Sequence, residues 1–306
     1  EATVDKVYDY LDRSRATEAF LNCIPAMSMY SIREGQRAAG QDASNKVIIF
    51  DTLMDSKSLF LTGNTSTMYA VGFLNLKKDG PTVIEVPPNQ QGILDDFWHR
   101  PLTDVGFVGP DKGEGGKYLI LPPDHVHLQG EVPDDYYVAK SPSWTNWFIA
   151  RGFLKDGKPD YSSKLFREGL KIYPLARKDN PPQMEFISGS GKSFNTIHAN
   201  NFEFYEELHA VIEREPVEML DPELRGLFAS IGIQKGKPFA PDARMKKIMT
   251  EAVAVANATA RAMLWDERHK DEFLYEGSYW KRGYPGDNYQ FLKDEGMGGR
   301  NLDART

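Results

Sequence analysis

The chain has 306 residues, of which 41% are hydrophobic and 26% are charged, so it is a folded protein long enough for two domains. Its net charge of −7 and pI near 5.5 argue against broad binding to nucleic acid or to anionic membranes, which requires a positive surface. Cys23 is the only cysteine, which excludes an internal disulfide and a thiolate zinc cage. No apolar stretch approaches the ~20 residues that span a bilayer.

The N-terminal segment, residues 1–45, is predicted to be helical. Apolar residues such as Val4, Val7 and Leu11 recur at helical spacing, and the pattern extends to Arg37. Pro25 is expected to interrupt the helix, because proline lacks the backbone N–H that a helix interior needs.

Residues 46–190 predict a β domain, because short apolar runs alternate with proline, glycine, Asn and Asp. No βαβ alternation is visible, so the predicted fold is an antiparallel β-sandwich followed by a helical module, an α+β multidomain chain. The expected strands are Val47–Phe50, Leu59–Leu61, Met68–Leu74, Thr82–Val86, Tyr118–Leu121, Tyr136–Ala139 and Trp144–Phe153.

A glycine-rich stretch, Asp104–Asp124, places five glycines between two apolar runs. Glycine permits positive φ and close approach of a backbone or a ligand. The stretch therefore predicts a hairpin-like element with a long glycine-lined loop, and it contains no catalytic signature.

Residues 191–274 predict a helical domain. Its helices are expected at Phe202–Glu213, Pro222–Ile231 and Pro241–His269, and Asp242 is expected to cap the third. Residues 275–306 are aromatic and glycine-rich and are expected to act as a linker that packs on another domain or on a neighbouring subunit.

Two motifs suggest chemistry but have a simpler interpretation. Ser188–Ser193 resembles a phosphate-binding loop, yet Phe186 occupies the position of the required first glycine. His125 and His127 alternate beside Asp124 at a spacing that suits metal ligands, although two solvated histidines are the expectation. We therefore expect no metal and no cofactor.

A denser cluster, Asp95–Arg100, is the strongest candidate for a site. Asp95, His99 and the nearby Asp104 are the predicted acid–base groups, and Trp98 with Arg100 would bind a flat or anionic ligand. The alternative is the start of a helix, with capping acids and one buried tryptophan.

Arg151 is a second candidate, because it ends the apolar run Trp144–Ala150 and an unpaired charge there would be costly. It needs a carboxylate partner or a ligand.

Several segments together resemble the paired bacterial families called domain of unknown function twelve-fifty-four and twelve-fourteen. The resemblance is carried by Gly63–Tyr69, Pro81–Pro87, Asp104–Pro123, Gly191–Ile197, Phe204–Leu208 and Asn301–Arg305. It implies a small β-sandwich, a helical module and a second β domain that would follow Thr306. It also implies that Asn64 and Tyr69, in the first motif, are candidate binding residues.

The resemblance further implies an exported protein, periplasmic or secreted, that forms homo-oligomers or contacts the second β domain; a cytoplasmic location stays open. Two functions are compatible with these features. One is an exported hydrolase or lyase acting on a small polar or acidic substrate in a cleft between domains. The other is a noncatalytic envelope module that binds a carbohydrate or a partner protein through Trp98, Trp144 and Trp147.

Overall fold

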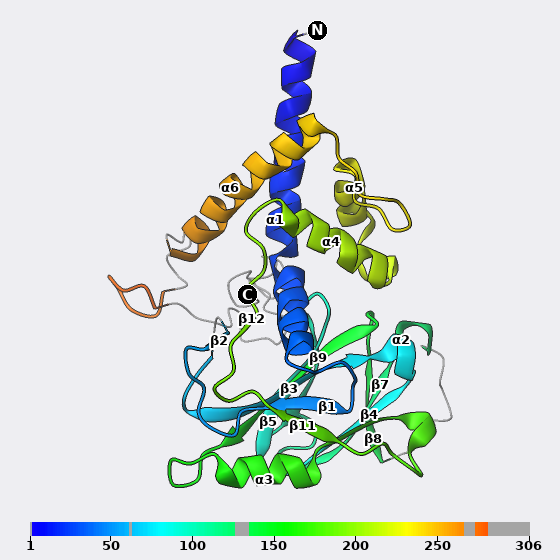
Figure 1. The fold of residues 1–306 in the computed structure, drawn as a ribbon, viewed down its shortest axis with the longest axis vertical. Helices are drawn as coiled ribbons and strands as arrows, with labels where there is room; N and C mark the ends of the chain where they lie inside the picture. The colour runs from blue at the N-terminus through cyan, green and yellow to red at the C-terminus, as the bar shows by residue number, and fades with distance from the viewer. Residues whose placement is uncertain (1, 61–62, 126–134, 266–272, 281–306) are drawn as a thin grey trace. The chain divides into compact units, whose positions relative to one another are not determined.

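The computed structural model describes residues 2–60, 63–125, 135–265 and 273–280, and the chain divides into two compact units (Figure 1). Unit 1 combines Glu1–Ser28 with His198–Thr306, and unit 2 is the continuous stretch Met29–Ile197. The described residues form six α-helices and two mixed sheets, which places the protein in the predicted α+β class. The domain boundaries expected at residues 45, 190 and 274 stay predictions.

The first helix, α1 (Ala2–Ala38), runs through Pro25 without a break, so the predicted interruption is wrong. Cys23, Ala26 and Met27 are fully buried on either side of the proline. Burial of these side chains offsets the hydrogen bond that a proline removes from a helix interior, a loss of about 3 kcal/mol. The helix contributes residues up to Ser28 to unit 1 and the following residues to unit 2.

The larger sheet of unit 2 has six strands in the order β11-β1-β3-β9-β5-β6. All its neighbouring strands are antiparallel except β1 and β11, which pair in parallel. The strands span Lys46–Ile49 (β1), Thr67–Asn75 (β3), Gln90–Asp96 (β5), Pro101–Gly106 (β6), Thr145–Phe153 (β9) and Glu185–Ser188 (β11). The strands β5 and β6 are not among the predicted ones, because their apolar residues are interrupted by Gln, Gly, Asp and Thr.

The smaller sheet has the order β10-β4-β7-β8, with β7 and β8 in parallel. Its strands span Thr82–Val86 (β4), Gly116–Leu121 (β7), Tyr136–Lys140 (β8) and Lys171–Pro174 (β10). A further parallel pair joins β2 (Ser58–Leu59) to β12 (Phe194–Asn195). The expected antiparallel arrangement is therefore corrected to a mixed one, since long connections bring sequence-distant strands such as β1 and β11 side by side.

The two sheets share one hydrophobic core. Leu94 and Phe148 of the larger sheet pack with Ile84 and Ile120 of the smaller one, and Phe166 of α3 (Asp160–Gly169) completes the cluster. The remaining short elements of unit 2 are α2 (Leu76–Asp79) and the 3-10 turns Pro123–His125 and Leu175–Arg177.

The glycine-rich stretch does not form the predicted hairpin. Its first strand, β6, belongs to the six-stranded sheet, and its second, β7, belongs to the four-stranded sheet. The loop between them therefore connects two sheets. Sequence periodicity identifies strands without identifying their partners.

The predicted helices of unit 1 are confirmed as α4 (Glu203–Arg214), α5 (Pro222–Ser230) and α6 (Ala243–Trp265), with a 3-10 turn at Val217–Met219. Asp242 caps α6 as expected, since its Oδ1 accepts the N–H of Met245 at 2.7 Å. No helix in the described ranges combines the length and the apolarity needed to cross a membrane.

His198 of unit 1 provides a test by pH. Burial lowers its pKa below the ordinary value of 6.5, because the rings of Phe20 and Phe204 lie 6.2 and 5.6 Å away. The stabilisation from the neutral ring is complete above the unfolded pKa and is lost as the pH falls through the depressed folded pKa. We expect thermal melts of the wild type to fall more steeply between about pH 7 and about pH 5 than melts of His198→Gln. His209→Gln is the control and should keep the steep slope; parallel profiles for wild type and His198→Gln would contradict the assignment.

Candidate functional site

The hairpin of β5 and β6 closes through a tight turn that Asp96 builds. Asp96 is 1% exposed, and its Oδ1 accepts the backbone N–H groups of Trp98 at 2.8 Å and Arg100 at 3.0 Å. Its Oδ2 accepts Nε–H of Arg100 at 2.6 Å, and the N–H of His99 donates to its carbonyl at 3.0 Å. The alternative prediction of a helix start at these residues is therefore wrong, because the two acids end a strand.

A buried polar cluster supports the turn from the neighbouring segment. Ser143 Oγ accepts the N–H of Phe97 at 3.1 Å and donates to the carbonyl of Thr145 at 2.7 Å. Asn146 Nδ2 donates to Ser141 Oγ at 2.7 Å and to Ser143 Oγ at 2.8 Å. Buried and bonded hydroxyls of this kind hold the hairpin in one geometry.

Strand alternation brings the predicted acids to one face of the six-stranded sheet, which we call the outward face. Leu94 points into the shared core, so its neighbours Ile93 and Asp95 point outward. Ile93 pairs with Asp104 on β6, and Asp95 pairs with Trp147 on β9. Asp95 and Asp104 are therefore diagonal neighbours, and their Cα atoms are expected at roughly 7–8 Å.

The same face continues along β9. Arg151 follows Trp147 by four residues and pairs with Tyr69 on one side and Gln91 on the other. The fold thus brings four of the predicted site residues to one face: Tyr69, Asp95, Asp104 and Arg151.

The side chains of Asp95 and His99 are paired at the edge of this face. His99 Nε2 lies 3.4 Å from Asp95 Oδ2, and the side chains are 18% and 5% exposed. A β-bulge falls between Leu94 and Asp95, and His99 has a φ of 54°, both common next to functional sites. The ring of Trp147 meets that of His99 edge-on at 5.8 Å, and its buried Nε1–H has no hydrogen-bond partner in the described part of the chain.

Asp104 differs electrostatically from an ordinary surface aspartate. Burial raises its pKa above the usual value, because the carboxylate loses water. None of the hydrogen bonds and ion pairs within the described ranges involves its carboxylate. A half-buried aspartate of this kind holds its proton to higher pH than an exposed one and is suited to donate it.

Arg151 lies exposed on the outward face, so its charge is not buried as its apolar flank suggested. The guanidinium stacks 5.5 Å above the ring of Tyr69. No described carboxylate lies within ion-pair distance of it, so the expected alternative of a structural ion pair is not observed there. A ligand for Arg151 stays a prediction.

The other predicted binding residues hold local structure. Asn64 Oδ1 accepts the N–H groups of Ser66 and Thr67 at 3.0 Å each, and its Nδ2 donates to the hydroxyl of Tyr69. Trp98 is 5% exposed, and Arg100 bonds to the carboxylate that forms the turn.

Asp111 organises the glycine-rich loop. Its Oδ1 accepts the N–H of Gly106 at 2.6 Å and the hydroxyl of Tyr118 at 2.5 Å, and its Oδ2 accepts the N–H of Gly115 at 3.1 Å. Gly106 has a φ of 81°, and a Cβ there would lie 1.9 Å from the carbonyl oxygen of Gln90, so only glycine fits.

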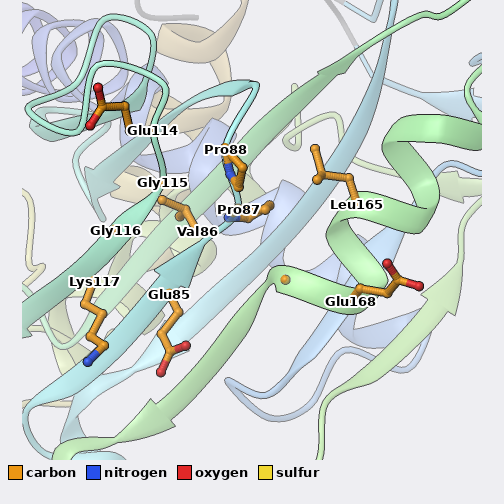
Figure 2. Close-up of a pocket in the computed structure, with 11 residues that line it drawn as sticks. Glu85, Val86, Pro87, Pro88, Glu114, Gly115, Gly116, Lys117, Leu165 and Glu168 are labelled. Carbon is orange, nitrogen blue, oxygen red and sulfur yellow. The ribbon is translucent and has the colours of Figure 1, made fainter.

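The same loop lines a shallow hollow of about 440 Å³ in unit 2 (Figure 2). Figure 2 shows Glu114 and Glu168 on opposite sides of it, with Pro87 between them. Glu85 and Lys117 are neighbours on β4 and β7, but Tyr173 and Lys171 bond to Glu85, and Asp135 bonds to Lys117. The converging acid–base groups that catalysis needs are absent among the residues lining this hollow.

The sequence motifs for phosphate and metal have no structural support within the described residues. Lys192 follows β11 in a turn that leads to β12, where a phosphate-binding loop would lead into a helix. His125 Nδ1 lies 2.7 Å from Asp124 Oδ1 on an exposed turn. His127 lies outside the described residues, and the described ones contain no group of three ligands that could hold a metal ion.

Asp96, Asp111 and Trp147 are structurally important residues that the predicted site does not include. The sequence does indicate that Trp147 lies near Arg151, because Trp147, Ile149 and Arg151 are spaced two residues apart and must share one face of a strand. Asp111 lies between Gly109-Pro110 and Lys112-Gly113, a typical turn setting, although its three partners cannot be read from spacing.

Comparison with known proteins finds a family match within unit 2. Residues 44–174 match the family described as "Protein of unknown function (DUF1254)". The predicted resemblance to domain of unknown function twelve-fifty-four is confirmed over these residues. The DUF1254 region lies within unit 2 and contains all eight predicted site residues. Its description assigns no activity, no curated protein matches the chain, and the second β domain after Thr306 stays a prediction.

One solved structure shares the fold of most of this chain. The VPA0106 protein from Vibrio parahaemolyticus aligns with a TM-score of 0.57 and 15% identity, covering 83% of this chain and 59% of that one. Such low identity shows the fold alone, and the chain spans 59% of that protein's length. An uncharacterized protein from Burkholderia cenocepacia aligns with a TM-score of 0.29 and 9% identity over 58% of this chain and 52% of that one, too weakly to support an argument.

Proposed function

We propose that the protein is an enzyme of the hydrolase or lyase type whose active site is the outward face beside the β5–β6 hairpin. The observation that carries this proposal is the Asp95–His99 pair, 3.4 Å apart and largely withdrawn from solvent, on the face that also presents Asp104. A carboxylate that orients an imidazole is the usual arrangement of a general base. Small polar or acidic molecules are the proposed substrates, with export to the periplasm or medium as part of the proposal.

In the proposed reaction one residue accepts a proton from the attacking or reacting group and another donates a proton to the leaving group. His99 would take a proton from a water molecule in hydrolysis, or from carbon in elimination, and the imidazolium would be stabilised by Asp95. Asp104 would give a proton to the leaving group, for which its raised pKa is favourable.

The alternative of an aromatic binding strip has weaker support. Trp98 is 5% exposed and Trp147 is 8% exposed, so two of its three indoles present little flat surface to a sugar. A glycan-binding strip needs open aromatic faces. The acid–base arrangement therefore supports an enzyme better.

The test is a screen of hydrolase and lyase substrates with the intact chain, followed by variants. We expect His99→Gln and Asp95→Asn to lower the activity found by about 10²–10⁴-fold, the usual contribution of a general base. His125→Gln is a matched control, because His125 also pairs with an aspartate but lies on an exposed turn. Equal activity in His99→Gln and His125→Gln would refute the proposal.

Leaving-group dependence separates the role of Asp104 from that of His99. Asp104→Asn is expected to lose much less activity on substrates whose leaving group departs without a proton, such as nitrophenolates. His99→Gln should lose activity equally on both kinds of substrate. A uniform loss in Asp104→Asn would remove it from the role of general acid.

A further inference from the structure

An exposed aromatic patch lies beside Arg151 on the outward face. It consists of Phe107, Val108 and Phe153, which are 49%, 60% and 43% exposed. The rings of Phe107 and Phe153 meet edge-on with centroids 5.6 Å apart. Phe153 follows Arg151 by two residues on β9, so both side chains point outward from the same strand.

The patch is held rigidly by the glycine-rich loop. Asp111 fixes Gly106, the residue before Phe107, through a hydrogen bond of 2.6 Å. A Cβ on Gly113 would lie 2.7 Å from the Phe107 ring, so the loop backbone packs directly on that ring. A rigid exposed apolar surface is typical of a binding site, because its groups need little ordering when a ligand arrives.

Arg151 adds a positive charge to this surface, which indicates an anionic ligand. Its guanidinium is exposed, stacks 5.5 Å above Tyr69, and has no described carboxylate within ion-pair distance. Arginine binds carboxylates through two parallel N–H donors, and stacking on an aromatic ring orients this planar group.

We infer that Arg151 and the aromatic patch form a subsite for small aryl carboxylates. The carboxylate of the ligand binds Arg151, and its ring packs on Phe107 and Phe153. This inference rests on the proposed function, because it names the substrate class that the outward face selects. Arg151 lies four residues from Trp147 along β9, about 13 Å, so the anion is held away from the acid–base groups.

The test is calorimetric titration of the intact chain with 3-phenylpropionate. We expect saturable binding that weakens about tenfold in Arg151→Gln and several-fold in Phe153→Thr. 3-Phenylpropanamide, which lacks the charge, should bind about tenfold more weakly than 3-phenylpropionate, and acetate, which lacks the ring, should also bind more weakly. Arg177→Gln and Val138→Thr change an exposed arginine and an exposed valine elsewhere on unit 2, and both should bind like the wild type.

Three outcomes decide the inference. Equal affinity in wild type and Arg151→Gln, or no saturable binding to wild type, would overturn it. A dimer that dissociates in Phe153→Thr, measured by light scattering, would assign the patch to self-association and would also overturn it. Binding that persists in His99→Gln, whether or not that variant is active, supports the subsite independently of the proposed reaction.

Discussion

Replacing Asp111 with alanine is expected to lower the free energy of unfolding of unit 2 by about 3–5 kcal/mol. The carboxylate is 3% exposed and accepts bonds from Gly106, Gly115 and Tyr118. Hydrogen bonds to a charged group contribute about 1.5–3 kcal/mol each, and removing the acceptor leaves buried N–H groups without partners. Urea unfolding followed by the fluorescence of the unit 2 tryptophans measures the change.

Asp111→Asn is the matched control for this prediction. The amide oxygen can still accept from Gly106, whereas the amide nitrogen would face the N–H of Gly115, a donor opposite a donor. We therefore expect the free energy of unfolding of Asp111→Asn to lie between that of the wild type and that of Asp111→Ala. If Asp111→Ala lowers the free energy of unfolding by less than about 1 kcal/mol, the backbone conformation of the loop glycines stabilises the loop and the Asp111 hydrogen bonds do not.

Replacing Asp96 with alanine is the second change with a large expected effect. It removes the acceptor of three hydrogen bonds, two from the backbone and one from Arg100 Nε, in a carboxylate that is 1% exposed. We expect a loss of at least about 3 kcal/mol in the free energy of unfolding, with the turn that carries His99 no longer fixed. Urea unfolding gives the stability, and the NMR signals of the His99 ring report its orientation.

A variant of the neighbouring residue Asp95 distinguishes an effect on stability from an effect on the proposed reaction. Asp95 orients His99 without forming the turn, so Asp95→Asn should keep most of the stability while losing the proposed activity. If Asp96→Ala unfolds like the wild type and keeps the His99 signals unchanged, Asp96 does not stabilise the turn that carries His99. Equal destabilisation by both variants would mean that Asp95 also builds the turn.

The sequence predicts elements better than it predicts their partners. The helices of unit 1 are predictable because apolar residues recur at helical spacing over at least nine residues. The strands β5 and β6 were missed because Gln90 and Asp96 face the interior, where their burial depends on neighbours that no local pattern reveals. The parallel pair β1–β11 joins segments more than a hundred residues apart, beyond the reach of periodicity.

In the candidate site, too, the residues could be predicted from the sequence but their spatial neighbours could not. Asp95, His99 and Asp104 could be chosen from their residue types and proximity in sequence. That Arg151 and Tyr69 share their face follows from strand register, which is fixed by tertiary pairing. The structural role of Asn64 depends on bonds to its own loop, and residue type alone does not distinguish that role from ligand binding.

The discontinuity of unit 1 has a consequence for biosynthesis. A ribosome delivers all of unit 2 before it begins the segment at His198 that completes unit 1. Ala19, Phe20 and Cys23 of α1 are fully buried in the finished protein, yet their partner Phe204 does not exist during that interval. The nascent chain therefore carries an uncovered apolar helix face for the time needed to translate residues 29–197, and transiently exposed apolar surface of this kind is prone to aggregation.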